Sequence, residues 1–236
     1  MTAITAIDEA RLREAIVAAG RRLGARGLIS AGEGNLSIRL PGDRLLVTPT
    51  GRRKDELATD DLVVVELDAD GPSAAATSAS GLGPTSDLAI HRAVQGARSD
   101  IAAVAHAHLP ATMALTLAGI RPDATALPET ALFLPRLDVL PYGEPGSADL
   151  ARRVAGALTA EPVPYPGAVI LERHGAVATG GSQPDPARPR ADATERLVAS
   201  LNQAVDRLEL IEVLARAWRD LLLLRAATGA GYPSRP

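Results

Sequence analysis

Apolar residues recur along the chain with two alternating periods, one typical of helices and the other typical of strands. Near the N-terminus, Leu12, Ile16 and Leu23 follow helical spacing, and Gly27 marks the expected end of that helix. Short runs of apolar and β-branched residues predict strands. The predicted strands span residues 36–40, 45–48, 62–67, 101–108, 138–142 and 168–172, with one more around residue 177.

Predicted helices lie between or after these strands. Ser86 is a suitable N-cap for a helix that runs to about residue 96, and Pro110 begins another that ends near residue 117. Residues 147–158 form a further helix, and residues 191–227 form two helices or one bent helix. Residues 69–84, rich in Gly, Ser, Ala and Pro, are typical of a flexible connection. Because no segment divides the chain convincingly, we treat residues 1–236 as one domain.

Composition and charge exclude several functional classes. The chain has no cysteine, which excludes disulfides, thiolate ligands and cysteine nucleophiles. Its formal net charge is −3 with acids and bases mixed along it, so it offers no basic surface for nucleic acid. No apolar run approaches membrane-spanning length, and the N-terminus lacks a signal-peptide pattern. We therefore expect a cytoplasmic enzyme with no membrane and no nucleic-acid partner.

Lysine is nearly absent although arginine is abundant, which we attribute to genomic composition bias. Of the 25 Lys and Arg residues, Lys54 is the only lysine. It lies in the charged run 52–56, which predicts a solvated amine whose pKa is not lowered. The sequence therefore argues against a mechanism that forms a Schiff base.

Three of the four histidines carry the clearest chemical signal. His106 and His108 are two residues apart in a predicted strand, so both imidazoles should point to the same face. His174 follows another predicted strand and precedes Gly175. Three imidazoles and one carboxylate would form a ligand set typical of zinc or another borderline divalent ion. On spacing alone, a metal site and a pair of surface histidines both remain open.

Three turns have features that suit an anion. Residues 32–37 form a glycine-rich turn before a strand, residues 48–51 offer hydroxyls and exposed amides, and residues 84–86 precede a helix N-terminus. For each turn alone, an ordinary turn with a capping hydroxyl is the simpler interpretation. The Gly-x-Gly of the first turn is not a dinucleotide fingerprint, because it opens a strand and lacks the third glycine.

Taken together and in order, six motifs resemble the class II aldolase/adducin family, which includes L-fuculose-1-phosphate aldolase and L-ribulose-5-phosphate 4-epimerase. The motifs are GNLS (34–37), TPTG (48–51), PTSD (84–87), HAH (106–108), PYG (141–143) and RHG (173–175). The resemblance covers about residues 27–180 and is compatible with the helical region that begins near residue 191. It implies a three-layer α/β/α fold around a central, largely antiparallel sheet. It also implies a homotetramer with active sites near subunit interfaces.

The resemblance assigns roles to individual residues. One divalent ion per chain, typically Zn²⁺, would be held by Asp87, His106, His108 and His174. The phosphate of a small sugar phosphate would be held by Gly34, Asn35, Thr50, Gly51, Thr85 and Ser86. Asp87 would also act as the acid/base, with Tyr232 contributed from the C-terminal tail of a neighbouring subunit. A disordered tail is an equally good interpretation of the region around Tyr232. His91, one helical turn after Asp87, is expected to be structural.

Two departures from the family leave the reaction open. Asp87 stands where the aldolases carry glutamate and the epimerase carries aspartate, and Thr85 replaces a serine while keeping the hydroxyl. A segment that the epimerase uses for catalysis lacks its aspartate here, where Glu129 is the nearby carboxylate.

The resemblance implies a fuculose-1-phosphate-like lyase, which cleaves a ketose 1-phosphate to dihydroxyacetone phosphate and an aldehyde through a metal-stabilised enediolate. The alternatives are a sugar-phosphate 4-epimerase or decarboxylase of the same family, and a non-catalytic adducin-like module. The complete set of three histidines argues against the module, because a scaffold does not need metal ligands.

Overall fold

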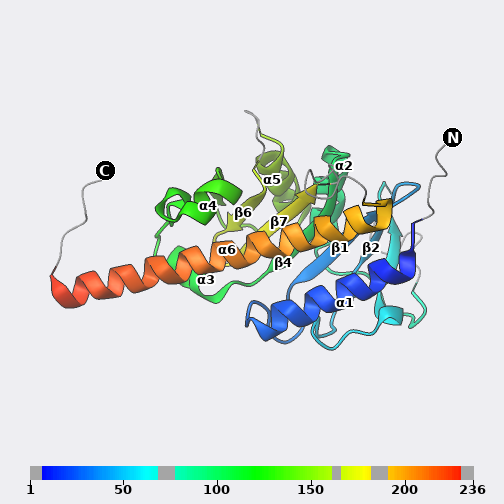
Figure 1. Cartoon of the computed structure of the whole chain (residues 1–236), viewed down its shortest axis with the longest axis horizontal. Coiled ribbons are helices and arrows are strands. Elements are labelled where there is room, and N and C mark those ends of the chain that lie inside the picture. The colour runs from blue at the N-terminus through cyan, green and yellow to red at the C-terminus, as the bar shows by residue number, and fades with distance from the viewer. Residues whose placement is uncertain (1–6, 69–77, 161–165, 182–190, 230–236) are drawn as a thin grey trace.

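A computed structural model describes residues 7–68, 78–160, 166–181 and 191–229 of the chain. In this part, seven strands form one central sheet in the order β3-β2-β1-β4-β7-β6-β5 (Figure 1). All neighbouring strands are antiparallel except β5 and β6, which are parallel. The predicted, largely antiparallel sheet is therefore confirmed.

The strands are β1 (Asn35–Leu40), β2 (Arg44–Val47), β3 (Val63–Glu66), β4 (Ile101–Ala107), β5 (Leu137–Leu140), β6 (Ala168–Leu171) and β7 (Gly175–Gly181). The α-helices are α1 (Glu9–Ala25), α2 (Leu88–Ala97), α3 (Pro110–Leu117), α4 (Pro128–Phe133), α5 (Ala148–Leu158) and α6 (Ala193–Thr228).

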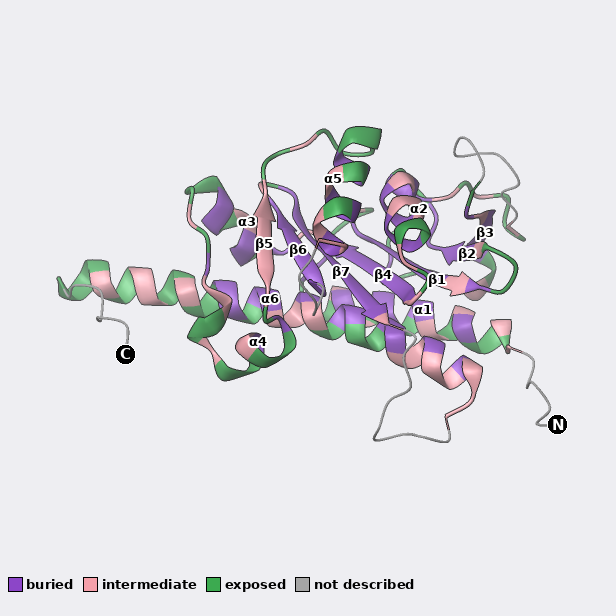
Figure 2. Ribbon diagram, turned by 90° about the horizontal axis from the view of Figure 1, so that it is seen from above, coloured by how far each residue is buried: buried purple, intermediate pink, exposed green. Residues whose placement is uncertain are grey.

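Helices cover both faces of the sheet, and the alternation of side chains along β4 decides which core each residue joins. Ala103 and Ala105 pack into the core formed with α1 and α6, whereas Val104 packs with α2 and α5. Figure 2 shows the central strands buried between these two layers. The fold thus has the three layers that the family resemblance implies.

Helix α6 is continuous over 36 residues, where the sequence allowed two helices or one bent helix. It begins with a capping box in which Asp192 accepts from the Glu195 amide and Glu195 accepts from the Asp192 amide. It ends at Gly229, which adopts the left-handed conformation. No Gly or Pro interrupts it, so the helix has no local reason to break.

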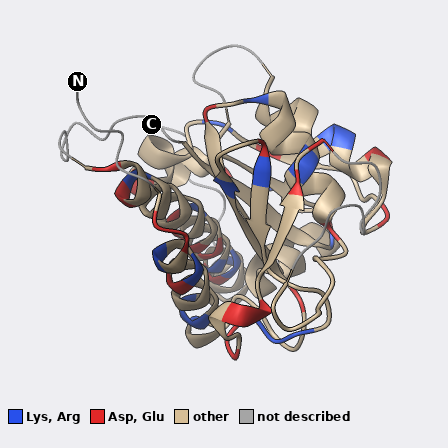
Figure 3. Cartoon of the chain, turned by 90° about the vertical axis from the view of Figure 1, so that its right-hand side faces the viewer, with Lys and Arg blue, Asp and Glu red and all other residues tan. Residues whose placement is uncertain are grey.

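Charged residues are distributed along α1 and α6, as Figure 3 shows. The two helices are joined by ion pairs of Arg22 with Asp206 (2.5 Å) and Glu209 (2.7 Å). Among the described residues, no helix combines the length and the apolar character that a membrane span requires.

Three local expectations differ from the structure or fall outside it. Helix α2 begins one residue later than predicted, with Asp87 instead of Ser86 at the N-cap position. Asp87 makes no capping hydrogen bond, because its carboxylate is engaged by Asn35. Helix α4, which includes Glu129, was not predicted. Most of the flexible connection expected over residues 69–84, and the tail with Tyr232, lie outside the described residues.

Candidate active site

The register of the sheet places the first site residues side by side. Asn35 on β1 lies opposite His106 on β4, and Ser37 lies opposite Val104. Directly opposite residues of neighbouring strands project on the same face of a sheet. Val104 belongs to the core beneath α2 and α5. Asn35, Ser37 and His106 therefore face α2, the helix that carries His91 and follows Asp87.

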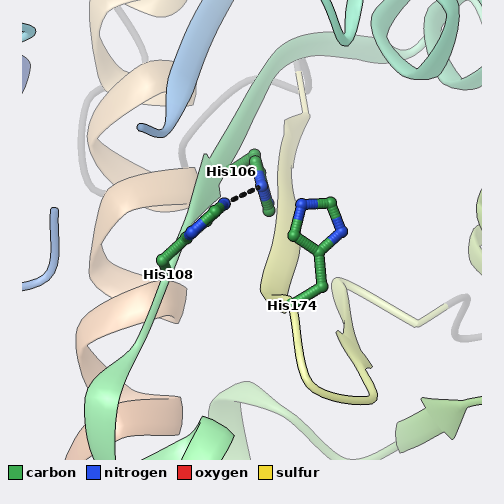
Figure 4. A group of neighbouring side chains, drawn as sticks. All are labelled: His106, His108 and His174. Carbon is green, nitrogen blue, oxygen red and sulfur yellow. Dashed lines mark hydrogen bonds between the residues drawn. The ribbon is translucent and has the colours of Figure 1, made fainter. Parts of the chain in front are cut away.

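The three predicted imidazoles converge, as Figure 4 shows. One ring nitrogen from each of His106, His108 and His174 lies within 4.8 Å of the others, and the ring centroids are 4.9–5.0 Å apart. His106 is near the C-terminal end of strand β4, His108 follows the strand, and His174 lies in the turn between β6 and β7. Two separate parts of the chain thus supply one group of ligands.

Gly175 allows His174 to approach β4 so closely. Its φ of +106° is in the region that disfavours side chains, and a Cβ there would collide with the carbonyl oxygen of Ala107. The preceding Arg173 also has a positive φ, of 61°. The turn is therefore built to bring the His174 ring against the end of β4.

Hydrogen bonds at Nδ1 fix the orientation of two rings. Nδ1 of His106 donates to the carbonyl of Ala176 (2.9 Å), and Nδ1 of His108 lies 2.6 Å from Oε2 of Glu33. A carbonyl or carboxylate partner requires the proton on Nδ1, which leaves the lone pair on Nε2 of the neutral ring.

The two Nε2 atoms that remain fit a shared cation. They lie 3.1 Å apart, and two lone pairs at that distance repel each other unless a cation or a proton lies between them. Tetrahedral zinc with bonds of about 2.0–2.1 Å separates its ligand nitrogens by about 3.3 Å. The donor set therefore suits a divalent ion.

Burial keeps the imidazoles in the neutral form that binds metal. Desolvation, together with the nearby charge of His108, lowers the pKa of His106 to about 3. Desolvation also lowers the pKa of His174. Both rings are therefore neutral at physiological pH, and no proton competes with a metal ion for their lone pairs.

Asp87 is close to this group but is not part of it. Its Oδ2 accepts a hydrogen bond of 2.8 Å from Nδ2 of Asn35. Burial alone would raise the pKa of Asp87, but the neighbouring His106 and the hydrogen bond from Asn35 lower it overall. The structure brings Asp87 beside the three imidazoles as an ionised carboxylate, and its role as a ligand stays a prediction.

A buried chain of hydrogen bonds holds Asn35, the residue that donates to Asp87. Oδ1 of Asn35 lies 2.6 Å from Nε2 of His91, and Nδ1 of His91 lies 2.7 Å from Oγ of Ser37. Oγ of Ser37 also lies 2.8 Å from Oε1 of Gln95. His91 is fully buried and lies away from the three ligands, in agreement with the structural role expected for it.

The three predicted anion turns meet in one cavity of about 250 Å³ beside the imidazoles. Its lining includes all six predicted phosphate residues, together with Asp87, His108 and His174. The amides of Thr50 and Thr85 donate to Gly83 and Thr48, which joins the second turn to the third. These two amides are therefore unavailable to an anion, and the hydroxyls and neighbouring amides are the donors that the turns can offer.

A family model described as the class II aldolase and adducin N-terminal domain matches residues 14–218 of the chain. The chain belongs to this family. It is 32% identical over 190 residues to a 3-oxo-tetronate 4-phosphate decarboxylase of Haemophilus influenzae, covering 78% of this chain and 82% of the relative. It is also 32% identical over 183 residues to a methylthioribulose-1-phosphate dehydratase of Acidiphilium cryptum, covering 72% and 80%.

The crystal structure of L-fuculose-1-phosphate aldolase from Thermus thermophilus has the same fold. It superposes with a TM-score of 0.72 at 29% identity, covering 95% of this chain and all of that one. Family members that resemble this chain therefore include a decarboxylase, a dehydratase and an aldolase. All three are lyases, so membership of the family leaves the reaction to be decided by the site.

Lys54 is where the sequence interpretation was wrong. Instead of being solvated, Lys54 is only 2% exposed and lines the cavity. Its Nζ donates to the carbonyls of Gly32 (2.6 Å) and Arg52 (2.7 Å). Burial lowers its pKa to about 8, although the charge of Asp87 acts in the opposite direction. Its status as the single lysine was the one sequence signal that set it apart.

Glu33 is a second pocket residue to which the sequence interpretation gave no role. It lines the cavity, contacts His108 through Oε2 and accepts from the hydroxyl of Ser30 through Oε1. A carboxylate behind a metal-binding imidazole orients the ring and increases its basicity. An acidic residue between two glycines of an expected anion turn was the available signal.

A larger hollow of about 1110 Å³ runs along α6, but it contains none of the predicted site residues. Its charged lining includes Arg98, Arg207, Glu195 and Asp206. Because it lacks the imidazoles and the three turns, the smaller cavity is the better candidate for the active site.

Proposed function

We propose that the chain is a metal-dependent lyase that removes CO₂ from a small phosphorylated 3-oxo acid. Retro-aldol cleavage of a ketose 1-phosphate is the second candidate. The proposal is supported by the three converging imidazoles, by the anion cavity beside them, and by the similarity to a 3-oxo-tetronate 4-phosphate decarboxylase over most of both chains.

Both reactions break a carbon–carbon bond one carbon away from a carbonyl group. The electron pair of that bond moves toward the carbonyl oxygen, and a proton is later delivered to carbon. A divalent ion at His106, His108 and His174, for which we propose Zn²⁺, would supply positive charge close to that oxygen. The protein's own contribution is to hold the substrate in place and to control the protons.

The two reactions differ in their need for a base. Retro-aldol cleavage requires a group that takes the hydroxyl proton of the departing aldehyde, whereas a 3-oxo acid loses CO₂ without such a step. Among the described residues, the carboxylates that line the cavity are Glu33 and Asp87. Glu33 is already bound to His108 and Ser30, and the lowered pKa of Asp87 makes that carboxylate a weak base. This observation favours decarboxylation.

The cavity also limits the size of the substrate. Its volume of about 250 Å³ lies below the range of about 300–1,000 Å³ typical of pockets for drug-sized ligands. A substrate of a few carbons with one phosphate suits this space. We assign the phosphate to the turns with Gly34, Asn35, Thr50, Gly51, Thr85 and Ser86, which puts the reacting carbons near the imidazoles.

The test is to incubate the zinc-loaded protein separately with 3-oxo-tetronate 4-phosphate, L-fuculose 1-phosphate and methylthioribulose 1-phosphate. We expect CO₂ from the first substrate and activity that is lost on chelation and restored by zinc. The His108→Ala variant should bind less metal than the wild type by elemental analysis. Dihydroxyacetone phosphate from the second substrate, with no CO₂ from the first, would replace the proposal with the aldolase.

A further inference from the structure

The single lysine lies beneath the anion cavity and not on the surface. Lys54 directs its ammonium group between two turns that border the cavity, and its side chain is almost completely buried. A buried ammonium is costly unless its N–H groups find partners. Two of them do, at the carbonyls of Gly32 and Arg52.

These two contacts join turns that are distant in the sequence. Gly32 belongs to the turn that leads into β1, and Arg52 follows the turn with Thr50 and Gly51. The main chain at Lys54 is itself fixed, since a Cβ at Gly20 of α1 would collide with the Lys54 carbonyl oxygen. The lysine therefore holds both turns at a set distance from a firmly packed position.

The charge of Lys54 is needed where the cavity would otherwise be negative. Glu33 and Asp87 line the same cavity, and Lys54 is the only Lys or Arg among the described residues of that lining. A phosphate dianion would therefore meet two carboxylates in this cavity. One fixed ammonium offsets this repulsion inside a cavity where water screens charges weakly.

The side-chain type also points to this role. Elsewhere the chain uses arginine without exception, yet this position has the one lysine. An ammonium is a compact point charge with three donors, whereas a guanidinium is planar and larger. The space between two backbone carbonyls under the cavity suits the compact group.

We propose that Lys54 is the cation of the phosphate pocket. Two of its N–H groups hold the Gly32 and Arg52 turns together, and its positive charge attracts the substrate phosphate. This inference rests on the proposed function, because it takes the cavity to be the phosphate site. It adds a residue that the motifs do not include.

The single lysine makes a direct measurement possible. Protein labelled with ¹⁵N- and ¹³C-lysine contains one lysine side chain, so its NMR signal belongs to Lys54. Titration with inorganic phosphate should shift that signal and raise the midpoint of its pH titration above the unliganded value. A bound dianion favours the charged form of the amine.

Other charged groups surround this amine and remain present throughout the titration. Those on its own turn are Arg52, Arg53, Asp55 and Glu56, while Glu33, Asp87, His108 and His174 line the same cavity. Helix α1 approaches through Gly20, which is uncharged. A phosphate-dependent change at constant pH therefore reports the anion and not these neighbours.

Two variants distinguish the effect of the Lys54 charge inside the pocket from the effect of removing a positive charge on the surface of the same turn. Lys54→Met should bind inorganic phosphate about 10- to 100-fold more weakly, the loss expected for a charge-assisted hydrogen bond. Arg53→Met removes a positive charge from the same turn, but Arg53 is exposed and paired with Asp55 and Glu56. Its phosphate affinity should stay within about twofold of the wild type, because surface ion pairs contribute little.

The possible results are distinguishable. If Lys54→Met does not fold, the wild-type NMR titration decides alone. Phosphate that binds without moving the Lys54 signal would overturn the inference and leave the pocket intact. No phosphate binding to the wild type would contradict the pocket itself, and with it the inference. Covalent trapping of 3-oxo-tetronate 4-phosphate on Lys54 by borohydride would overturn it as well, because the lysine would then act as a nucleophile.

Discussion

At the residue scale, hydrogen bonds determine which atom of each side chain faces the pocket. The Asn35 amide is held in one orientation, because Nδ2 must face the Asp87 carboxylate while Oδ1 accepts from His91. Desolvation by burial lowers the pKa of His91 to about 4, so the ring is neutral and carries its proton on Nε2. The result is a carboxylate at a fixed place and in a fixed charge state beside the three imidazoles.

We expect Asp87→Asn to keep the fold and most of the metal but to lower turnover by about 10²-fold or more. An amide can still accept from Asn35, but it cannot carry a proton or a negative charge. Asp87→Glu should retain measurable activity, since it preserves the carboxylate. Steady-state kinetics with metal content measured on the same samples would check this. Normal turnover by metal-loaded Asp87→Asn would show that the Asp87 carboxylate takes no part in the reaction.

The ordered motifs of the family resemblance indicated which histidines and which turns lie together, although each motif alone left the question open, and their roles as metal ligands and phosphate site stay predictions. The sequence did not predict that Lys54 is buried. The burial of Lys54 depends on α1, because Gly20 of this helix packs against the Lys54 main chain although the two residues are far apart in the sequence. It also assigned no role to Glu33, whose partner His108 lies on a different strand end.

At the element scale, the turn between β6 and β7 decides whether the third imidazole reaches the other two. This turn brings His174 against the end of β4 with a close approach that only Gly175 permits. The antiparallel pairing of β4 with β7, in which His106 lies opposite Val177, then fixes how far along the strands the His174 ring lies from the His106 ring.

Gly175→Ala should therefore destabilise the protein by about 1–3 kcal/mol and reduce its metal content. The new methyl group would push the turn away from Ala107 and displace His174. Thermal unfolding and elemental analysis would measure both effects. The matched control is Gly156→Ala on α5, where nothing lies within 4 Å of the new methyl group. It should be neutral or slightly stabilising. Equal behaviour of the two variants would show that the turn tolerates a side chain.

Most elements were predicted from periodicity, and the differences at α4 and α6 have physical reasons. Helix α4 is six residues long, which is too short to show a helical period. For α6 the sequence pattern allows one bent helix or two helices, because its leucines do not keep a single face. Its first part is buried on the sheet, whereas its last turns have exposed Leu223 and Leu224.

At the scale of the whole molecule, the C-terminal half of α6 extends beyond the sheet (Figure 1). It exposes apolar side chains there, with Val213 54%, Leu223 62% and Leu224 65% exposed. Exposed apolar surface of this kind is typical of a protein–protein contact. We infer that this half of the helix packs against another subunit, in line with the homotetramer proposed from the family.

Light scattering should accordingly give the mass of four chains of 24.4 kDa each. Leu223→Glu combined with Leu224→Glu should lower that mass, because two charges cannot be buried in an apolar contact. Arg152→Glu on α5, exposed on the other side of the sheet, should not change it. A monomeric wild type, or an unchanged mass for the double variant, would refute the assignment of this surface.

The imidazoles and the anion turns come from different parts of the scaffold, and this separation has an evolutionary consequence. The rings belong to the end of β4 and the β6–β7 turn, whereas two of the three anion turns lie at or beyond β1 and β2. A mutation near the imidazoles can therefore alter the reaction while the turns proposed to bind the substrate phosphate stay unchanged. Divergence would then proceed by exchanging one proton-carrying group at a time, which offers a simple route to a family whose members include decarboxylases, dehydratases and aldolases.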